Sequence, residues 1–345
     1  MIPHSRPDIS GKEIRAVVTA LGKRHLSQGS EVQKLEAKLS RMYNGAEAVV
    51  VSSGTAALYL SLLALGIKAG HKVIIPSYTC NSLYAAVNLS GATAICADSG
   101  ENSVNIDVST IDPLIDEKTA ALIVPHMFGF LANIGSIKKT GIPLIEDCAQ
   151  AIGGHYPDGT LTGTKGDIAI LSFYATKLVP AGEGGACITK HSKTAEIIRS
   201  LRDCDKQRPR AKAFNFKMTD ISATLAVAKL SSLQANIRQR SSIAEKFDQA
   251  LGNNSFRLKS SNPQCVCFRY LASRQKNLQS ILQKSLKAGI SCNKPTWQAL
   301  HHSIGGHCPN AEMLERTLLS VPLYPGLTRR EIRRICRVLP ELLAE

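Results

Sequence analysis

The sequence lacks the cysteine pairs and Cys/His clusters that bind structural metals. None of its ten cysteines forms a CxxC pair, and only Cys265 and Cys267 stand close together. Structural zinc sites place their ligands at such spacings, so no metal site is expected. Cys96, Cys148 and Cys187 stand singly inside apolar runs. We expect these three to be reduced, buried thiols, and we expect no disulfide framework.

Long uninterrupted apolar segments and an apolar N-terminal core are also missing. Two chargeless stretches, 48–67 and 73–97, are each broken by polar or turn residues. A membrane-spanning helix needs about 20 predominantly apolar residues in a row, so neither stretch is expected to face lipid. Residues 1–7 lack the hydrophobic core of a signal peptide. These absences predict a cytoplasmic protein without a membrane partner.

Acidic residues are scarce, since 27 Asp and Glu accompany 42 Lys and Arg, which gives a net charge of +15. The excess suggests nucleic acid, a phosphorylated small substrate, or a solvated surface as its explanation. Aromatic residues are few, and no RNA- or DNA-binding motif is present, so a nucleic-acid partner is not expected. The other two explanations stay open. The basic residues concentrate at 329–337 and in a first segment that contains Arg199, Arg202, Lys206, Arg208, Arg210, Lys212 and Lys217.

The remaining pattern predicts an α/β protein of about two domains. The 345 residues are 44% hydrophobic and 20% charged, as in folded globular proteins. Apolar strands alternating with helices imply a sheet covered on both faces. We expect strands at 48–51, 72–75, 94–97, 121–124, 143–145, 168–171 and 185–188, with helices at 55–65 and 82–88.

The C-terminal third is expected to form a smaller α/β domain. An amphipathic helical stretch over 220–250 leads the chain out of the first domain. The boundary is placed so that residues 1–235 form the large domain and 236–345 the small one. Thr328 and Glu331 mark the start of a last helix.

One lysine, Lys177, lies in a segment, 168–182, that is otherwise without charge. Apolar surroundings disfavour its charged form and make the amine available as a nucleophile. Asp147 ends an apolar run thirty residues upstream. Pyridoxal 5'-phosphate (PLP) requires such a pair, because the lysine forms a Schiff base with its aldehyde and the carboxylate keeps its pyridine nitrogen protonated. Each residue alone also has an ordinary explanation, since most lysines extend to solvent.

Other polar residues follow neighbouring strands. The turn 52–57 is built of small and hydroxylated residues that would let backbone N–H groups approach a phosphate at a helix N-terminus. Any strand-to-helix turn favours such residues, so this signal is weak alone. Ser172 is a second candidate phosphate ligand, and Gln150 a candidate partner for a phenolic oxygen. Glu146 should face away from Asp147.

Together these residues resemble the DegT/DnrJ/EryC1/StrS family, the PLP-dependent sugar aminotransferases of the aspartate aminotransferase superfamily. The matching segments run in order over nearly the whole chain. They are Ser53-Gly-Thr-Ala-Ala-Leu58, Ile75-Pro-Ser-Tyr-Thr79, Glu146-Asp-Cys-Ala-Gln-Ala-Ile-Gly153, Ser172-Phe-Tyr-Ala-Thr-Lys177, Gly182-Glu-Gly-Gly185, Asn215-Phe-Lys-Met-Thr-Asp-Ile-Ser-Ala223, Cys308-Pro-Asn-Ala-Glu312 and Ser320-Val-Pro-Leu-Tyr-Pro325.

The resemblance implies the PLP-transferase fold of type I: a large domain with a mostly parallel mixed sheet covered by helices, and a smaller C-terminal α/β domain. It implies that Lys177 forms the internal aldimine, that Asp147 pairs with the pyridine nitrogen, and that Gln150 contacts the phenolic oxygen. The phosphate would be held by Gly54, Thr55, Ala56 and Ser172.

Two further positions acquire a meaning from the resemblance. Asn215 matches a residue that in this family reaches the phosphate from the neighbouring subunit, which implies a homodimer with shared active sites. Cys80 occupies the cofactor-binding position where the family usually has an aromatic residue stacked on the ring. The stacking surface is therefore expected to differ here.

The implied reaction moves an amino group from glutamate or glutamine to the keto group of a nucleotide-linked sugar, for polysaccharide or secondary-metabolite synthesis. The family's dehydratase branch has histidine in place of the lysine, and Lys177 argues against that branch. Two alternatives stay open. One is amination of a free cyclic ketone, as in aminocyclitol pathways, and the other is a PLP-binding regulatory protein without turnover.

Overall fold

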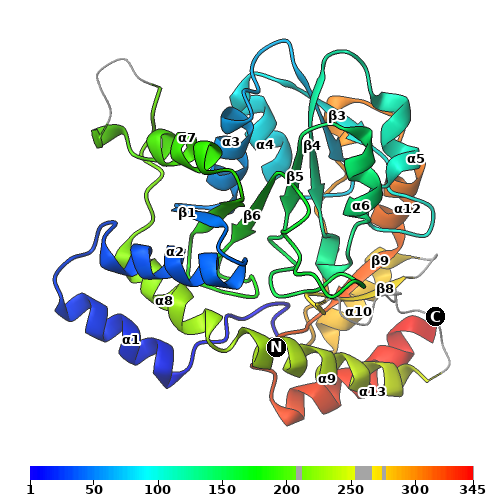
Figure 1. The fold of residues 1–345 in the computed structure, drawn as a ribbon. Helices are drawn as coiled ribbons and strands as arrows, with labels where there is room; N and C mark the ends of the chain where they lie inside the picture. Colours follow the sequence, from blue (N-terminus) through cyan, green and yellow to red (C-terminus); the bar gives the residue numbers. More distant parts are fainter. Residues whose placement is uncertain (207–211, 253–265, 274–276, 345) are drawn as a thin grey trace.

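The computed structural model describes residues 1–206, 212–252, 266–273 and 277–344 (Figure 1). Its centre is a seven-stranded sheet in the order β1-β7-β6-β5-β4-β2-β3. Only β7 runs antiparallel to its neighbours, so the predicted mixed, mostly parallel sheet is confirmed. The strands are β1 Glu47–Val51, β2 Lys72–Pro76, β3 Thr93–Ala97, β4 Thr119–Pro125, β5 Leu144–Asp147, β6 Ile168–Ser172 and β7 Gly185–Thr189.

Helices cover both faces of this sheet because side chains along each strand alternate between two apolar cores. In β1, Val49 and Val51 pack in one core, and Ala48 and Val50 in the other. The first core contains α3 Gly54–Ala64, α4 Ser82–Ser90 and α7 Ser192–Arg202. The opposite face is covered by α2 Ser30–Met42, α5 Val108–Ile111, α6 Ile134–Ile137 and α8 Asp220–Leu230, with α1 Gly11–Gly22 packed on α8. Short 3-10 helices are η1 Asp112–Leu114, η2 Met127–Gly129, η3 Lys138–Thr140 and η4 Cys204–Lys206.

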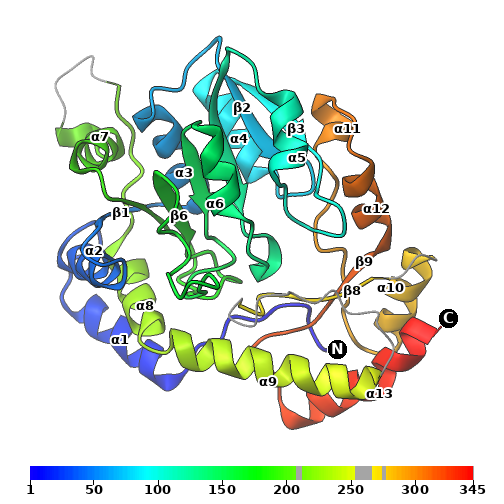
Figure 2. The ribbon, with the colours of Figure 1, turned by 45° about the vertical axis from the view of Figure 1, so that its right-hand side comes forward.

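The predicted continuous helix over 220–250 is wrong in one respect, because it is two helices, α8 and α9 Leu233–Leu251. The break falls at two serines. The Ser231 hydroxyl donates to the Val227 carbonyl at 3.2 Å, and the Ser232 hydroxyl to the Lys229 carbonyl at 3.1 Å. Such local hydrogen bonds compete with the helical ladder. The break lets α8 pack on the large sheet while α9 lies against the last helix (Figure 2).

The C-terminal part packs a two-stranded antiparallel sheet against helices. The Thr328–Glu331 capping pair is confirmed, since each residue's backbone N–H donates to the other's side chain. The predicted boundary at 235/236 falls just inside α9 and stays a prediction. The elements are β8 Tyr270–Ser273, α10 Leu278–Lys287, α11 His301–Ile304, α12 Pro309–Thr317, β9 Leu318–Val321 and α13 Arg329–Ala344.

The scattered features noted in the sequence have local explanations. Cys96, Cys148 and Cys187 are buried free thiols, as predicted. Within the described part of the chain, no helix is long and apolar enough to span a membrane. In the first basic segment, Arg199, Arg202 and Lys217 pair with carboxylates of this chain. Arg208 and Arg210 lie outside the described residues.

Candidate active site

Several of the predicted site residues lie where the parallel strands end. Asp147 is the last residue of β5 and Ser172 the last of the neighbouring β6. Lys177 follows five residues later, in the turn region beyond β6. A cavity of about 460 Å³ opens here, and Lys177, Cys80 and Gln150 all line it. Its other walls include Thr79, Phe128, Tyr174, Phe268, Arg269, Trp297 and Leu300.

Lys177 carries its amine in surroundings that disfavour a positive charge. Burial lowers the pKa of the Lys177 ammonium, and the positive charge of Arg269 lowers it further, while Asp147 and Cys80 act in the opposite direction. Its Nζ lies 5.4 Å from the centre of the Phe268 ring. The unusual composition noticed in the sequence thus reflects a half-buried lysine on a cavity wall, and its lowered pKa favours the neutral amine.

Asp147 is a buried carboxylate, and one of its two oxygens accepts a backbone hydrogen bond. Its side chain accepts a hydrogen bond from the Ala149 N–H at 2.9 Å, and the residue is only 5% exposed. Burial raises the pKa of Asp147, against smaller opposing effects of the Ala149 N–H, Lys177 and His126. A carboxylate in this position is stabilised by a cation, which is what a protonated pyridine nitrogen supplies.

Gln150 takes part in an unusual turn. Its side-chain oxygen accepts from the Phe128 N–H at 2.9 Å. Phe128 has φ of 58°, in the left-handed region that few residues other than glycine adopt. Because the oxygen is occupied, the amide nitrogen of Gln150 remains as the donor at the cavity wall. A donor at that place is suited to a phenolic oxygen.

The turn at the start of α3 offers backbone donors. The Ser53 hydroxyl accepts from the Ala56 N–H at 3.0 Å, so that amide is already engaged. Among the described residues, the Gly54 and Thr55 N–H groups have no partner, as expected for the first turn of a helix. The helix dipole adds positive potential there. Two free amides therefore lie where the sequence predicted a phosphate site.

Two glycines let the strands approach this turn. A Cβ on Gly54 would lie 2.9 Å from the Ser172 Cβ, so Ser172 sits directly against the start of α3. A Cβ on Gly185, in β7, would lie 2.5 Å from the Ser53 carbonyl oxygen. These residues do not line the 460 Å³ cavity, but Ser172 accepts from the N–H of Tyr174, which does.

Asn215 is exposed in the segment that follows the first basic stretch. Its neighbour Phe216 accepts a hydrogen bond from the Ser52 N–H at 2.8 Å, which places the segment beside the end of β1. Within the described part of the chain, the Asn215 side chain makes no hydrogen bond to Lys177 or Asp147, and Asn215 does not line the cavity. Its predicted role in a partner's site stays a prediction.

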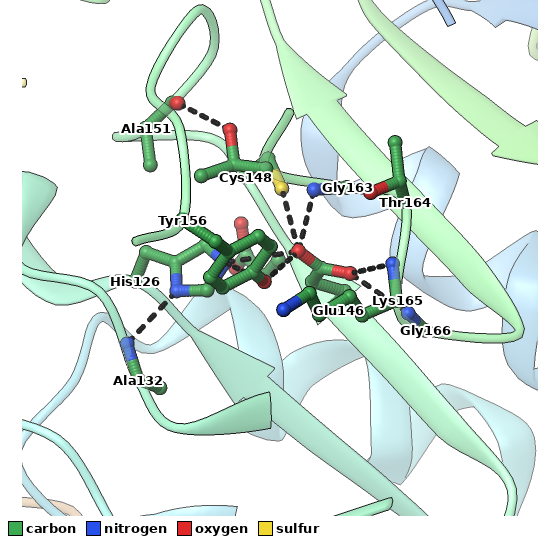
Figure 3. A network of polar contacts seen from close by, with 12 residues as sticks. His126, Ala132, Glu146, Cys148, Ala151, Tyr156, Gly163, Thr164, Lys165 and Gly166 are labelled. Carbon is green, nitrogen blue, oxygen red and sulfur yellow. Dashed lines mark hydrogen bonds and ion pairs between the residues drawn. The ribbon is translucent and has the colours of Figure 1, made fainter. Parts of the chain in front are cut away.

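Glu146 faces away from Asp147, as predicted, and forms a closed polar network behind the site (Figure 3). One carboxylate oxygen accepts from the His126 ring at 3.1 Å and from the Tyr156 hydroxyl. The other accepts from the Gly166 N–H at 2.8 Å. The Nδ1 atom of the His126 ring accepts a hydrogen bond from the Ala132 N–H. The ring proton is therefore on Nε2, which donates a hydrogen bond to Glu146.

The same network contains a grouping of metal-ligand types. Atoms of His126, Glu146 and Cys148 lie within 4.8 Å of one another. Both oxygens of Glu146 and both ring nitrogens of His126 are already engaged in hydrogen bonds. These hydrogen bonds explain why the three side chains lie so close together. Since the His126 backbone N–H also donates to the Asp147 carbonyl at 3.1 Å, the network fixes the end of β5.

Glu146→Gln is expected to destabilise the fold by about 3 kcal/mol, because an amide presents a donor to groups that need an acceptor. Burial acts to raise the pKa of Glu146, but His126, Tyr156 and Gly163 more than offset it and hold that pKa near 2. The stabilisation is thus present above about pH 4.5 and is lost as the pH falls toward 2.

Chemical denaturation of both proteins at pH 7 and pH 3 measures this difference. The variant's deficit should shrink at the lower pH. Glu117→Gln, at an exposed glutamate, is the matched control and should change little at either pH. Equal deficits at both pH values would contradict an ionised Glu146.

Sequence reasoning missed Phe268 and Arg269 on the cavity wall, together with His126 and Tyr156 behind it. Arg269 carried a usable signal, because it is the only charge in the run Cys265-Val-Cys-Phe-Arg-Tyr-Leu-Ala-Ser273, as Lys177 is in its own segment. His126 and Tyr156 gave none, since only the fold brings them beside Glu146.

Comparison with known proteins assigns the chain to a family. A model of the DegT/DnrJ/EryC1/StrS aminotransferase family matches residues 7–340. The chain belongs to this family. It is an aminotransferase, and the enzymes of this family use PLP. The predicted family, enzyme class and cofactor are thereby confirmed.

Solved structures of the family show the same fold. DesV of S. venezuelae, crystallised with a ketimine intermediate, has 26% identity and a TM-score of 0.89 over 97% of this chain and 95% of its own. The PLP form of the sugar aminotransferase Spr1654 from Streptococcus pneumoniae has 23% identity and a TM-score of 0.92 over 99% and 98%. DesI, crystallised with its TDP-sugar product, has 23% identity and a TM-score of 0.90 over 100% and 93%. The PLP-transferase fold of type I is confirmed.

Proposed function

We propose that this aminotransferase moves an amino group from glutamate or glutamine to the keto group of a nucleotide-linked sugar, with Lys177 as the Schiff-base residue. The observation that carries the proposal is the burial of Lys177 beside Asp147 at the ends of the parallel strands. An amine that gives up its proton readily and a carboxylate that needs a cation are complementary to the aldehyde and the pyridine nitrogen of PLP.

The other groups fit the cofactor as well. Gly54 and Thr55 offer free N–H groups at a helix N-terminus, where a phosphate is stabilised. Ser172 packs against the same turn and adds a hydroxyl. Ala56 contributes less than predicted, because its N–H is engaged by Ser53. Gln150 would donate from its amide nitrogen to the phenolic oxygen.

These residues divide the work of the reaction. When bound, PLP draws electrons from the carbon that loses or gains a proton. Asp147 would hold the pyridine nitrogen in its protonated, electron-withdrawing state. Lys177 would act as the base for that carbon once the amino donor replaced it on the cofactor, because its lowered pKa leaves the amine free to accept a proton. The same amine would deliver that proton to the cofactor's carbon within the donor half-reaction, and the acceptor half-reaction would reverse both transfers.

Three features support a nucleotide-linked substrate and a dimer. DesI, of the same fold, was crystallised with a TDP-sugar product. The net charge of +15 suits a diphosphate. Asn215 is exposed, as a residue that reaches a partner's phosphate must be. A homodimer with shared active sites and a cytoplasmic location belong to this proposal.

Incubation of the PLP-loaded enzyme with glutamate and a panel of keto-sugar nucleotides tests the substrate class. Mass spectrometry should detect the amino-sugar nucleotide. Turnover of free cyclic ketones alone would contradict the nucleotide requirement and identify an aminocyclitol-type enzyme. Absence of turnover with both classes would contradict the sugar substrate.

Cys80→Phe is expected to tighten PLP binding about tenfold, because an aromatic ring at this position would stack on the cofactor. Cys80 lines the cavity and is exposed, so a larger side chain can be accommodated. Titration of the stripped protein with PLP, followed by absorbance, measures the affinity. Cys204→Phe, at another exposed cysteine, is the control. Unchanged affinity would mean that a different side chain already covers the ring.

A further inference from the structure

Arg269 lies on the wall of the active-site cavity, and within the described residues it has no carboxylate partner. Its Nη1 donates to His4 Nδ1 at 2.9 Å and to the Ser5 hydroxyl at 3.0 Å. Neither group is an anion: the Ser5 hydroxyl is uncharged, and the His4 ring is neutral because burial and the charge of Arg269 lower its pKa to about 3. Among the described residues no Asp or Glu pairs with Arg269, and outside them the only acidic residue is Glu345.

Three basic side chains lie against one aromatic ring at this place. Lys177 Nζ, Arg269 Cζ and Arg240 Cζ lie 5.4, 5.1 and 5.9 Å from the centre of the Phe268 ring. Arg240 is turned inward and donates to the carbonyl oxygens of Phe268 and Leu323 at 3.1 and 2.8 Å. Arg269 is the arginine that lines the cavity. A desolvated cation without an anion is costly, so an anionic ligand is expected to complete this site.

We propose that Arg269 binds the α-carboxylate of the amino-acid donor. This inference rests on the proposed function, since it takes Lys177 as the residue that the donor's amine displaces. Lys177 and Arg269 lie against the same ring, and an α-carboxylate is only two bonds from the reacting nitrogen. A guanidinium holds such a group through two parallel hydrogen bonds. A diphosphate is separated from its keto carbon by the sugar ring and is expected farther from Lys177.

The N-terminal segment holds Arg269 in place. His4 also contacts the Ser320 hydroxyl of β9 at 2.9 Å, and Ile2 pairs with Ile290. Figure 2 shows this segment running beside β8 and β9. The guanidinium is therefore fixed before a ligand arrives, which lowers the entropic cost of binding.

Glutarate, a dicarboxylate without an amino group, probes the site because it cannot react. Its affinity for the PLP-loaded enzyme is measured by calorimetry for wild type, Arg269→Gln, Arg269→Lys and the exposed control Arg238→Gln. We expect Arg269→Gln to weaken glutarate binding about 10- to 100-fold, with a smaller loss for Arg269→Lys and none for the control. Circular dichroism of each variant verifies folding.

A second measurement distinguishes a carboxylate of the donor from a phosphate of the nucleotide as the anion that Arg269 binds. The donor half-reaction with glutamate alone, followed by the cofactor's absorbance, should slow in Arg269→Gln, while the affinity for uridine diphosphate should not change. Weakened uridine diphosphate binding with unaltered glutarate binding would overturn the inference in favour of a phosphate site. So would unaltered binding of both probes in folded Arg269→Gln.

Failure of the proposed function is distinguishable from failure of this inference. If peptide mapping places the cofactor on a residue other than Lys177, the proposed function fails. Because glutarate binding does not require a reaction at Lys177, its dependence on Arg269 still tests the carboxylate site directly.

Discussion

Lys177→Ala is expected to reduce turnover by at least about 10⁴-fold, because one amine serves as both the covalent anchor and the proton carrier. The variant should also lack the visible absorbance of a protonated Schiff base. Borohydride reduction followed by peptide mapping should place the pyridoxyl label on Lys177 in the wild type and nowhere in the variant. Since burial lowers the pKa of Lys177, the loss of the side chain should not destabilise the fold through its charge.

Lys190→Ala is the matched control, since Lys190 is exposed and follows β7 on the same sheet. It should retain turnover and absorbance. A label on another lysine in the wild type, or wild-type activity in Lys177→Ala, would contradict the central assignment.

Asp147→Asn is the second change with a large expected effect, a loss of about 10²- to 10³-fold in turnover. An asparagine is nearly the same size but cannot hold the pyridine nitrogen in its protonated form. The variant should therefore bind PLP more weakly and complete each half-reaction more slowly. Stopped-flow absorbance of the donor half-reaction measures the rate independently of the acceptor.

The same substitution should stabilise the protein when the cofactor is removed. Burial raises the folded-state pKa of Asp147 above its unfolded value of 3.8, so its carboxylate opposes folding above that range. Without PLP, Asp147→Asn should unfold at a higher temperature than the wild type at pH 7.5. That advantage should vanish as the pH falls below about 3.8, where the carboxyl is protonated in both states.

Adding PLP should reverse the order of stability, because only the wild type gains a cation beside its carboxylate. Thermal unfolding with and without PLP checks both expectations. An Asp147→Asn variant that is less stable in both conditions would indicate a structural carboxylate instead. Asp167→Asn serves as a comparison, because Asp167 directly precedes β6 and does not line the cavity.

The strands and the positions of the candidate residues at their ends were predictable from local patterns. Each strand of the large sheet is a short apolar run, and Asp147 and Ser172 end such runs as predicted. Lys177 was conspicuous because a single amine in a chargeless segment is visible in composition alone. The break between α8 and α9 was not predicted, because an amphipathic period continues across Ser231 and Ser232.

The cavity walls depended on residues distant in the chain. Arg269 and Lys177 lie against the same Phe268 ring only because the segment before β8 comes to the end of the large sheet, where His4 and Ser5 hold Arg269. Glu146 could be assigned to the face opposite Asp147, but its partners His126 and Tyr156 come from separate loops. Periodicity carries no information on such pairings.

By itself, the sequence determined the alternating α/β order, the family, and the identity of the lysine and carboxylate at strand ends, because each depends on residues that are near neighbours in the chain. Only the tertiary structure decided which amides at α3 stay free, how Gln150 is oriented, and which cation faces Lys177. These depend on burial and on distances between distant segments, which exist only after the chain has folded.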